Sequence, residues 1–186
     1  MQIKNIQQIT AMRHLNMFLV QYQDKVGKDK AWEFASRSGA RNLQQQDHPR
    51  NQSDVMPDAV VVVPFHTQEK KLVIIKEFRV VLGGYQYGFP AGLLDPGENM
   101  EQAGTRELFE ETGLTLTRVL RQSPAVYSSS GMTDESVCLL YAECEGMPSD
   151  AHTEDSEDIE TLMLTREGAG RLLSASDAKF DVKTWL

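Results

Sequence analysis

The hydrophobic residues of this chain fall mainly into short runs separated by polar and glycine-containing stretches, a pattern that predicts β-strands. Residues 58–66, DAVVVVPFH, are almost continuously apolar, which is typical of a strand covered on both faces. A short turn at 67–70 leads to KLVIIKEFR at 71–79, so these two runs predict a hairpin. The further predicted strands are LNMFLVQYQ (15–23), AWEFASR (31–37), 115–122, AVYSSS (125–130), SVCLLYAECEG (136–146) and IETLMLT (159–165).

Two stretches predict helices, and the longer one has clear signals at both ends. Asn99 is a favourable N-cap and Gln102 stands three residues later, as in a capping box. Gly113 is the glycine expected just past the last turn, so the helix is predicted over residues 100–112. A second, amphipathic helix is predicted within 166–175. Mixed strands with two helices predict an α+β fold in which a sheet lies between helices.

The longer helix has two contrasting faces. The residues predicted to face a core are Met100, Ala103, Gly104 and Leu108. The other face is predicted to carry Glu107, Glu110 and Glu111, which are neighbours because residues three and four apart meet on a helix surface. Like charges at this spacing cost roughly 0.2–0.5 kcal/mol per pair. The patch is therefore either a solvated acidic surface or a site for a hard divalent cation such as Mg2+.

The N-terminal part of the chain is predicted to be a separate β segment. We expect residues 1–56 to form this segment and a linker, and residues 57–186 to form the main domain. The stretch 39–57 is polar and contains two prolines, as expected of a loop. Two strands are too few to bury a core alone, so the segment must pack on the rest of the chain or on a second subunit. At the other end, Phe180 and Trp185 are expected to dock on the body.

Composition narrows the class of protein. With 186 residues, of which 40% are hydrophobic and 25% charged, the chain suits one globular domain with a small extension. It has no run of about 18 apolar residues that would span a membrane, and its first residues lack the apolar core of a signal peptide. Cys138 and Cys144 match no metal-ligand spacing, so we expect packing roles in a reducing, cytoplasmic compartment. The net charge of −8 argues against a nucleic-acid partner but permits a small anionic substrate bound through cations.

The stretch from Gly92 to Leu114 resembles the signature of the Nudix hydrolases, G-x5-E-x7-R-E-U-x-E-E-x-G-U, in which U is aliphatic. All nine fixed positions agree. The flanking sequences EFR and YQYGFPAGLLDPGE, and AWEFASR near the N-terminus, resemble the branch of ADP-ribose and nucleoside-diphosphate-sugar pyrophosphatases. The resemblance implies a Nudix α/β/α sandwich with a mixed sheet over residues 57–173. It also implies a homodimer that exchanges the N-terminal strands.

The resemblance also implies a metal site. Glu107 and Glu111 would ligate Mg2+, for which Mn2+ is an alternative, and Glu110 would share a second or third ion. The carbonyl of Ala91 would be a further ligand. Arg106 would orient the glutamates, although it is also placed for a plain i,i+4 ion pair with Glu110.

Two further roles follow from the resemblance. Glu98 would hold the junction between loop and helix or support the metal site from behind its ligands. The general base would come from the acidic loop before Ile159, where the register favours Glu157, with Asp155 or Glu154 as alternatives. An acidic loop that is merely solvated remains the simpler explanation for these residues.

Four residues outside this region are candidate substrate contacts. Arg37 and Arg79 would bind phosphate, because a guanidinium matches phosphate oxygens in a bidentate fork; otherwise each ends a strand in water. Trp32 would stack on a nucleobase and Glu33 would accept a hydrogen bond from its amino group. The alternative for Trp32 is a structural role in the dimer.

The expected function is hydrolysis of the pyrophosphate bond of a nucleoside diphosphate sugar or of ADP-ribose, which releases a nucleoside monophosphate and a sugar phosphate. Two departures from the branch pattern weaken the case for ADP-ribose itself: Ser130 stands where a proline is usual, and Gly88 where a glutamate is frequent. The alternatives are hydrolysis of a dinucleoside polyphosphate or an oxidised nucleoside triphosphate, and a ligand sensor without catalysis. The complete glutamate set disfavours the sensor.

Overall fold

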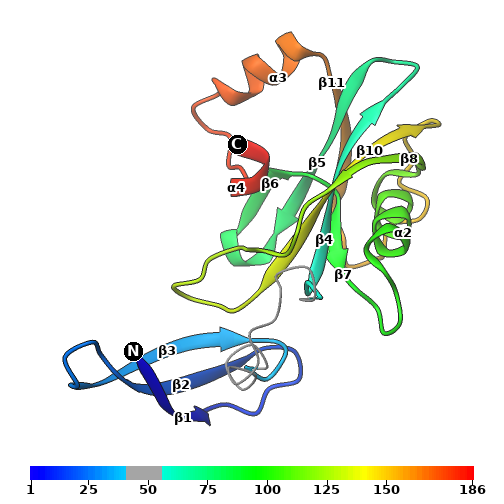
Figure 1. Cartoon of the computed structure of the whole chain (residues 1–186). Helices are drawn as coiled ribbons and strands as arrows, with labels where there is room; N and C mark the ends of the chain where they lie inside the picture. Colours follow the sequence, from blue (N-terminus) through cyan, green and yellow to red (C-terminus); the bar gives the residue numbers. More distant parts are fainter. Residues whose placement is uncertain (41–55) are drawn as a thin grey trace. The chain divides into compact units, whose positions relative to one another are not determined.

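The computed structural model describes residues 1–40 and 56–186 (Figure 1). The chain divides into two compact units, one formed by Met1–Asp58 with Pro124–Val137 and the other by Ala59–Ser123 with Cys138–Leu186. Most of the predicted linker, residues 41–55, lies outside the described residues. The predicted boundary between residues 56 and 57 stays a prediction, and the return of 124–137 to the first unit was not anticipated from sequence.

The first unit contains an antiparallel sheet in the order β1-β2-β3, formed by Gln2–Gln8, Asn16–Gln23 and Asp29–Ser36. The last two strands were predicted, and β1 was not. Its two apolar residues, Ile3 and Ile6, are three apart, which does not match strand alternation. A register shift between Ile3 and Asn5 allows both to pack against the same core, because a bulge re-aims the side chains that follow it.

The core of this unit lies on one face of the sheet and includes Phe18, Val20 and Phe34. The rings of Phe18 and Phe34 are stacked with centroids 5.6 Å apart. The segment 124–137 belongs to the same unit, since the amide of Ala35 donates to the carbonyl of Met132 at 2.8 Å. Of the predicted strand AVYSSS, only Val126–Tyr127 pairs as β9, with the first two residues of β10.

The second unit is built on a mixed sheet in which the described strands follow the order β11-β5-β4-β10-β8. Their bounds are Ile159–Leu164, Lys71–Arg79, Ala59–His66, Ser136–Glu145 and Thr115–Gln122. Two short strands extend the sheet: β6 (Gly84–Gly88) pairs with β5, and β7 (Ala91–Leu93) pairs with β4. The predicted hairpin of β4 and β5 is confirmed, with Phe65 opposite Leu72. Neither β6 nor β7 was predicted, because both are short and rich in glycine.

Helices lie on both sides of this sheet, as the sandwich prediction requires (Figure 1). Helix α2 (Met100–Thr112) covers one face, and α3 (Arg166–Leu173) and α4 (Val182–Trp185) lie on the other, while η2 (Val80–Leu82) is a single 3-10 turn between β5 and β6. The predicted bounds of α2 are confirmed. Asn99 and Gln102 form the reciprocal capping box, with bonds of 2.9 and 3.0 Å. Gly113 ends the helix in the left-handed conformation at φ 71°, where a side chain is unfavourable.

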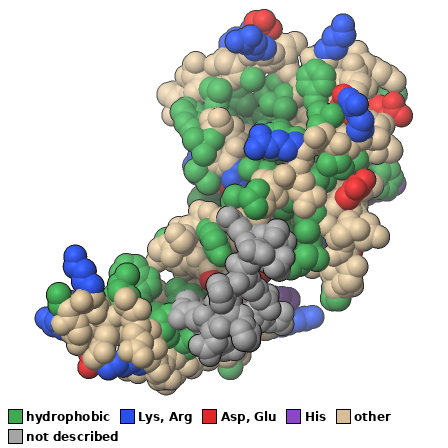
Figure 2. Space-filling model, viewed as in Figure 1, with side chains coloured by type: hydrophobic (Ala, Val, Ile, Leu, Met, Phe, Trp, Pro, Cys, Tyr) green, Lys and Arg blue, Asp and Glu red, His purple; other side chains and the backbone are tan. Residues whose placement is uncertain are grey.

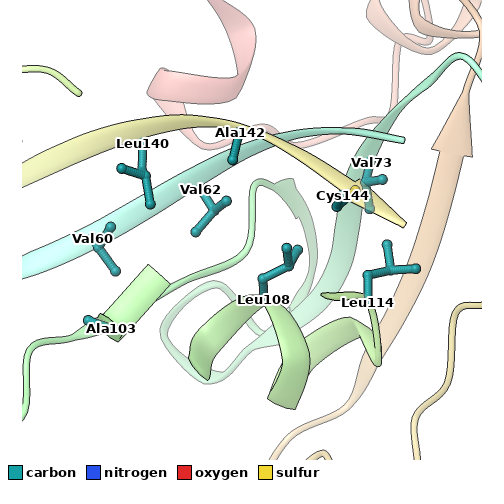
Figure 3. Close-up of a cluster of buried hydrophobic side chains, with 9 residues drawn as sticks. All are labelled: Val60, Val62, Val73, Ala103, Leu108, Leu114, Leu140, Ala142 and Cys144. Carbon is teal, nitrogen blue, oxygen red and sulfur yellow. The ribbon is translucent and has the colours of Figure 1, made fainter. Parts of the chain in front are cut away.

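The core between α2 and the sheet fixes the position of the helix. Figure 3 shows Ala103 and Leu108 of α2 lying against residues of β4 and β10, including Val60, Val62 and Leu140. Gly104 belongs to the same contact, because a Cβ atom there would stand 2.6 Å from a methyl group of Leu140. The predicted apolar face is thus confirmed for these residues, and Met100 is half-buried.

The C-terminal tail packs on β6, as expected. The ring of Phe180 lies 5.6 Å from that of Tyr87 and 5.3 Å from that of Trp185. Cys138 and Cys144 are free and buried, which agrees with the expected packing role. Across the described ranges, no helix is long and apolar enough to cross a membrane. The cytoplasmic location stays a prediction.

Candidate active site

Helix α2, strand β7 and the loop before β11 enclose a polar hollow of about 270 Å³ in the second unit. Five glutamates line it: Glu107, Glu110, Glu111, Glu154 and Glu157. The helix supplies three of them from consecutive turns, and the loop supplies two. The capping box and the packing of Leu108 fix the helix, so its acidic residues occupy defined positions beside the backbone of β7.

Glu111 is the most enclosed of these side chains. It is 6% exposed and accepts a hydrogen bond of 3.0 Å from the amide of Ala91. Burial raises the pKa of Glu111 well above its usual range, and the nearby charge of Glu107 raises it further. Glu111 shares the hollow with Glu107 and Glu110, but it is more buried than the predicted acidic face suggested. The helix turns this residue towards β7, on the side adjoining its apolar stripe.

Glu107 lies beside the backbone of the glycine that opens the acidic motif. Its side chain is 13% exposed, and burial raises its pKa despite the opposing effect of Arg106. A Cβ atom on Gly92 would overlap the carboxyl group of Glu107. A side chain at position 92 would therefore displace the carboxyl group of Glu107 from its present place.

Arg106 joins four parts of the site. Its guanidinium donates to both carboxylate oxygens of Glu98 at 2.9 Å, to Glu107 at 2.7 Å and to Glu110 at 3.1 Å. It also donates to the carbonyl of Leu93 at 3.1 Å. The predicted ion pair between Arg106 and Glu110 is present, but it is one contact of several. A single positive charge thus partly balances the negative charge on this side of the hollow.

Glu98 connects the loop before α2 to the helix. Besides its two bonds with Arg106, its carboxylate accepts a bond of 3.0 Å from the amide of Asp95. The Arg106 guanidinium, together with this amide, lowers the pKa of Glu98 to about 2. Glu98 is therefore held as a carboxylate at the start of the helix, behind the residues that line the hollow.

The donor set fits a hard divalent cation. Carboxylate oxygens are the ligands that Mg2+ prefers, and the buried Glu111 beside Glu107 lacks a compensating charge of its own. Within residues 1–40 and 56–186, no three acidic, histidine or cysteine side chains stand ready in a metal-binding arrangement. Glu107 and Glu110 point to Arg106 instead. Each of these two carboxylates bonds the guanidinium through one oxygen, Oε1 of Glu107 and Oε2 of Glu110, so Arg106 does not use its second oxygen.

The acidic loop brings Glu154 and Glu157 to the hollow. A local turn links the two residues: the amide of Glu154 donates to the Glu157 carboxylate at 3.0 Å, and the amide of Glu157 donates to the Glu154 carbonyl at 2.9 Å. The charge of Glu157 contributes to the raised pKa values of Glu107 and Glu111. Asp155, the alternative considered from sequence, is not among the residues that line the hollow.

Sequence reasoning missed Glu77 on β5. Its side chain is 19% exposed and forms an ion pair of 2.7 Å with Arg79. Burial raises its pKa, Arg79 opposes this effect, and Glu157 adds to it. Strand alternation could have revealed it. Residues 73 and 77 lie on the same face of β5, and Val73 packs in the core under α2, so Glu77 faces the same side. A carboxylate on the buried face of a strand indicates a polar site nearby.

The predicted substrate contacts are divided between the two units. Arg79 belongs to the second unit, where its pair with Glu77 leaves the side chain about half exposed. Trp32, Glu33 and Arg37 belong to the first unit. There the indole of Trp32 donates to the carbonyl of Gly131 at 3.1 Å, and Arg37 pairs with Glu135 at 3.2 Å. Trp32 remains 52% exposed, so its ring is available to a ligand.

Comparisons with known proteins agree with this architecture. Residues 55–186 match the family model described as the NUDIX domain. The chain is 32% identical over 140 residues to "Putative nudix hydrolase 2" of Caenorhabditis elegans, covering 70% of this chain and 62% of that protein. It is 35% identical over 129 residues to an "ADP-ribose pyrophosphatase" of Bacillus subtilis (strain 168), covering 69% and 68% of the two chains.

A solved structure shows the same fold. This structure, described as "Crystal structure of ADP compounds hydrolase", superposes with a TM-score of 0.68 at 22% identity. The match covers 94% of this chain and 83% of the other. At 22% identity the similarity shows a shared fold, which includes the N-terminal strands.

The burial of Glu111 leads to a test on metal-free protein. Because the folded state raises its pKa above 4.5, the folded protein binds more protons than the unfolded chain above that pH, and stability falls as pH rises through this window. Glu111→Gln removes this penalty and keeps an acceptor for the Ala91 amide. The variant should melt at a higher temperature than the wild type in EDTA, with a difference that grows from pH 5 to pH 8.

Thermal melts followed by circular dichroism at several pH values measure this difference. Glu101→Gln is the matched control, because Glu101 is an exposed glutamate of the same helix and its loss should produce no such trend. A Glu111→Gln variant that melts earlier than the wild type at every pH would show that the ionised carboxylate is favourable where it lies.

Proposed function

The chain belongs to the Nudix family, and we propose that it hydrolyses the pyrophosphate bond of a nucleoside diphosphate sugar or of ADP-ribose. The products are a nucleoside monophosphate and a sugar phosphate. The observation that carries the proposal is the convergence of Glu107, Glu111 and Glu157 on one hollow. The names of the relatives, which include an ADP-ribose pyrophosphatase, favour the same class of substrate.

Nudix hydrolases generally need a divalent cation, and we assign the binding of Mg2+, or of Mn2+ in its place, to Glu107 and Glu111. Glu110 and the carbonyl of Ala91 complete the ligand set. When bound, the cation neutralises pyrophosphate charge and makes the attacking water more acidic. Arg106 keeps Glu107 and Glu110 together at the mouth of the hollow, and Glu98 keeps Arg106 in place.

We assign the general base to Glu157. It lines the hollow from the loop before β11 and is held by the turn with Glu154. Its carboxylate would take the proton of the attacking water as that water reaches phosphorus. Because the base and the metal ligands come from different elements, the substrate phosphates would lie between them.

A panel of nucleotides tests the function. ADP-ribose, ADP-glucose and UDP-glucose are offered beside a dinucleoside polyphosphate and an oxidised nucleoside triphosphate, with product phosphate released by an added phosphatase. At least one nucleotide sugar should be hydrolysed in Mg2+, and hydrolysis should stop in EDTA. Turnover of the polyphosphate or triphosphate alone would select the other enzyme function, and binding without turnover would identify a sensor.

The assignment of the base is tested by substitution. Glu157→Gln should lower kcat by roughly 10²–10⁴-fold with little change in KM, the usual contribution of a general base. Asp155→Asn is the matched control, since it removes a charge from the same loop but not from the hollow. If Asp155→Asn shows the large loss and Glu157→Gln does not, the base lies two residues earlier.

We further propose that Trp32, Glu33, Arg37 and Arg79 contact the substrate and that the protein is a homodimer with exchanged N-terminal strands. The exposed face of the Trp32 indole supports base stacking, and the exposed part of Arg79 supports phosphate binding.

The predicted lack of a nucleic-acid partner stays a prediction. On the face in view, Lys and Arg side chains are scattered over each unit rather than gathered (Figure 2).

Trp32→Ala separates substrate binding from dimerisation. Stacking on an aromatic face is worth roughly 1–3 kcal/mol per base in single-strand binding, so KM should rise by about tenfold or more. The value of kcat should change less, because the base is remote from the reacting phosphorus. Kinetics and light scattering on one preparation measure both properties. Trp185→Ala, which removes the other tryptophan, is the control, and an intact Trp32→Ala dimer with unchanged KM would exclude stacking.

A further inference from the structure

The acidic loop is fastened to the sheet one residue after Glu157. Asp158 accepts two hydrogen bonds there, from two different strands. The hydroxyl of Tyr85 on β6 donates to the Asp158 carboxylate at 2.6 Å, and the amide of Phe78 on β5 donates to the Asp158 carbonyl at 3.0 Å. A hydroxyl bonded to a carboxylate at this distance is among the stronger hydrogen bonds of proteins.

The phenol ring of Tyr85 is itself held in place. It lies directly opposite Phe78 in the β5–β6 pair, and the two rings meet edge to face with centroids 5.5 Å apart. The ammonium of Lys76 stands 4.8 Å from the centre of the Tyr85 ring and pairs with Glu160 at 3.3 Å. The hydroxyl that reaches Asp158 is therefore positioned by the sheet.

These contacts lie on the face of the sheet opposite the hollow. Glu77 faces α2, and adjacent strand residues point to opposite sides, so Phe78 and its partner Tyr85 lie on the other side. The chain thus places Asp158 on one side and Glu157 at the hollow on the other. Fixing Asp158 limits where the carboxylate of Glu157 can go.

The other end of the loop is attached independently, to the end of α2. The amide of Ser149 donates to the carbonyl of Thr112 at 2.9 Å, and the rings of His152 and Phe109 lie 4.3 Å apart. These contacts precede Glu157 by several residues. Within the described residues, the bond between Tyr85 and Asp158 is the attachment nearest to Glu157 that comes from a side chain outside the loop.

We propose that Tyr85 and Asp158 form a latch that positions Glu157 for proton transfer. Tyr85 is a positioning residue, since it acts through Asp158 and reaches no reacting atom. The inference rests on the proposed function, in which Glu157 is the base. Small displacements of a catalytic group cost rate, because reaction requires the groups to be aligned.

Kinetics test the latch. Tyr85→Phe removes only the hydroxyl and should lower kcat by about tenfold, less than the loss of the base itself, with KM changed by less than about twofold. Asp158→Ala should show the same loss, and the double variant no more than either. Asp158→Asn retains an acceptor and should keep most of the activity. Tyr87→Phe, which removes a hydroxyl two residues along the same strand, is the matched control and should leave kcat unchanged.

Two results would overturn the proposal. A rise in KM with unchanged kcat in Tyr85→Phe would mean that Tyr85 touches the substrate. An undiminished loss when Tyr85→Phe is combined with Glu157→Gln would mean that Tyr85 acts elsewhere, because a residue that acts through Glu157 has nothing left to position.

Hydrogen exchange separates this inference from the proposed function. In substrate-free protein, Tyr85→Phe should speed amide exchange over residues 154–158 and at Phe78, whereas Tyr87→Phe should not. If amide exchange at these positions is unchanged in Tyr85→Phe, the proposed latch is wrong, whichever substrate the enzyme hydrolyses. If exchange is faster in Tyr85→Phe but the wild-type protein hydrolyses no nucleotide of the panel, the contact holds the loop in place. In that case both its proposed role in catalysis and the proposed function are wrong.

Discussion

Concentrating carboxylates in a half-buried hollow is the constraint on which the second unit depends. Removing one ionised carboxylate from water costs on the order of several kcal/mol, and its neighbours add repulsion. The protein offsets this cost with one guanidinium. Arg106 bonds Glu98, Glu107 and Glu110 at once, while the deeper Glu111 has the Ala91 amide and no cationic partner among the described contacts. The unbalanced charge therefore lies at Glu111 and Glu107, where a divalent cation is most favourable.

Helix α2 packs against the core with one side and carries the acidic residues of the hollow on the adjoining side. Leu108 packs against β4 and β10, whereas Glu111, three residues later, turns into the hollow. Two glycines permit the close approach that this requires. Gly104 leaves room for Leu140, and Gly92 leaves room for the carboxyl group of Glu107. The core thus supplies the stability that the acidic residues remove.

Local signals made the framework predictable, and long-range contacts explain what was missed. The bounds of α2 follow from Asn99 and Gln102 at its start and Gly113 at its end, and each of these residues acts on the adjacent turn of the helix. The bulge in β1, and the pairing of β6 and β7 with strands that already form a hairpin, are properties of the folded sheet. The grouping of Glu107, Glu110 and Glu111 followed from helix spacing, and the addition of Glu157 followed from family resemblance. The burial of Glu111 and the inward position of Glu77 depend instead on how α2 and β5 face each other. The sequence identifies the carboxylates, but their exposure to water depends on tertiary packing.

The glutamates at the hollow come from α2 and from the loop before β11, which lie far apart in the chain, and the charge of Glu77 on β5 acts on Glu111. Burial is the main cause of the raised pKa values of Glu77, Glu107 and Glu111, and repulsion between the carboxylates adds to it, so both effects oppose bringing these groups together. Order at the hollow must therefore be imposed by other contacts. Arg106 and the capped start of α2 provide these on one side, and the bonds to Asp158 provide them on the other. Contacts on the far face of the sheet thus help to set the position of the loop that reaches the hollow, because a loop without regular structure takes its position from the few bonds at its ends.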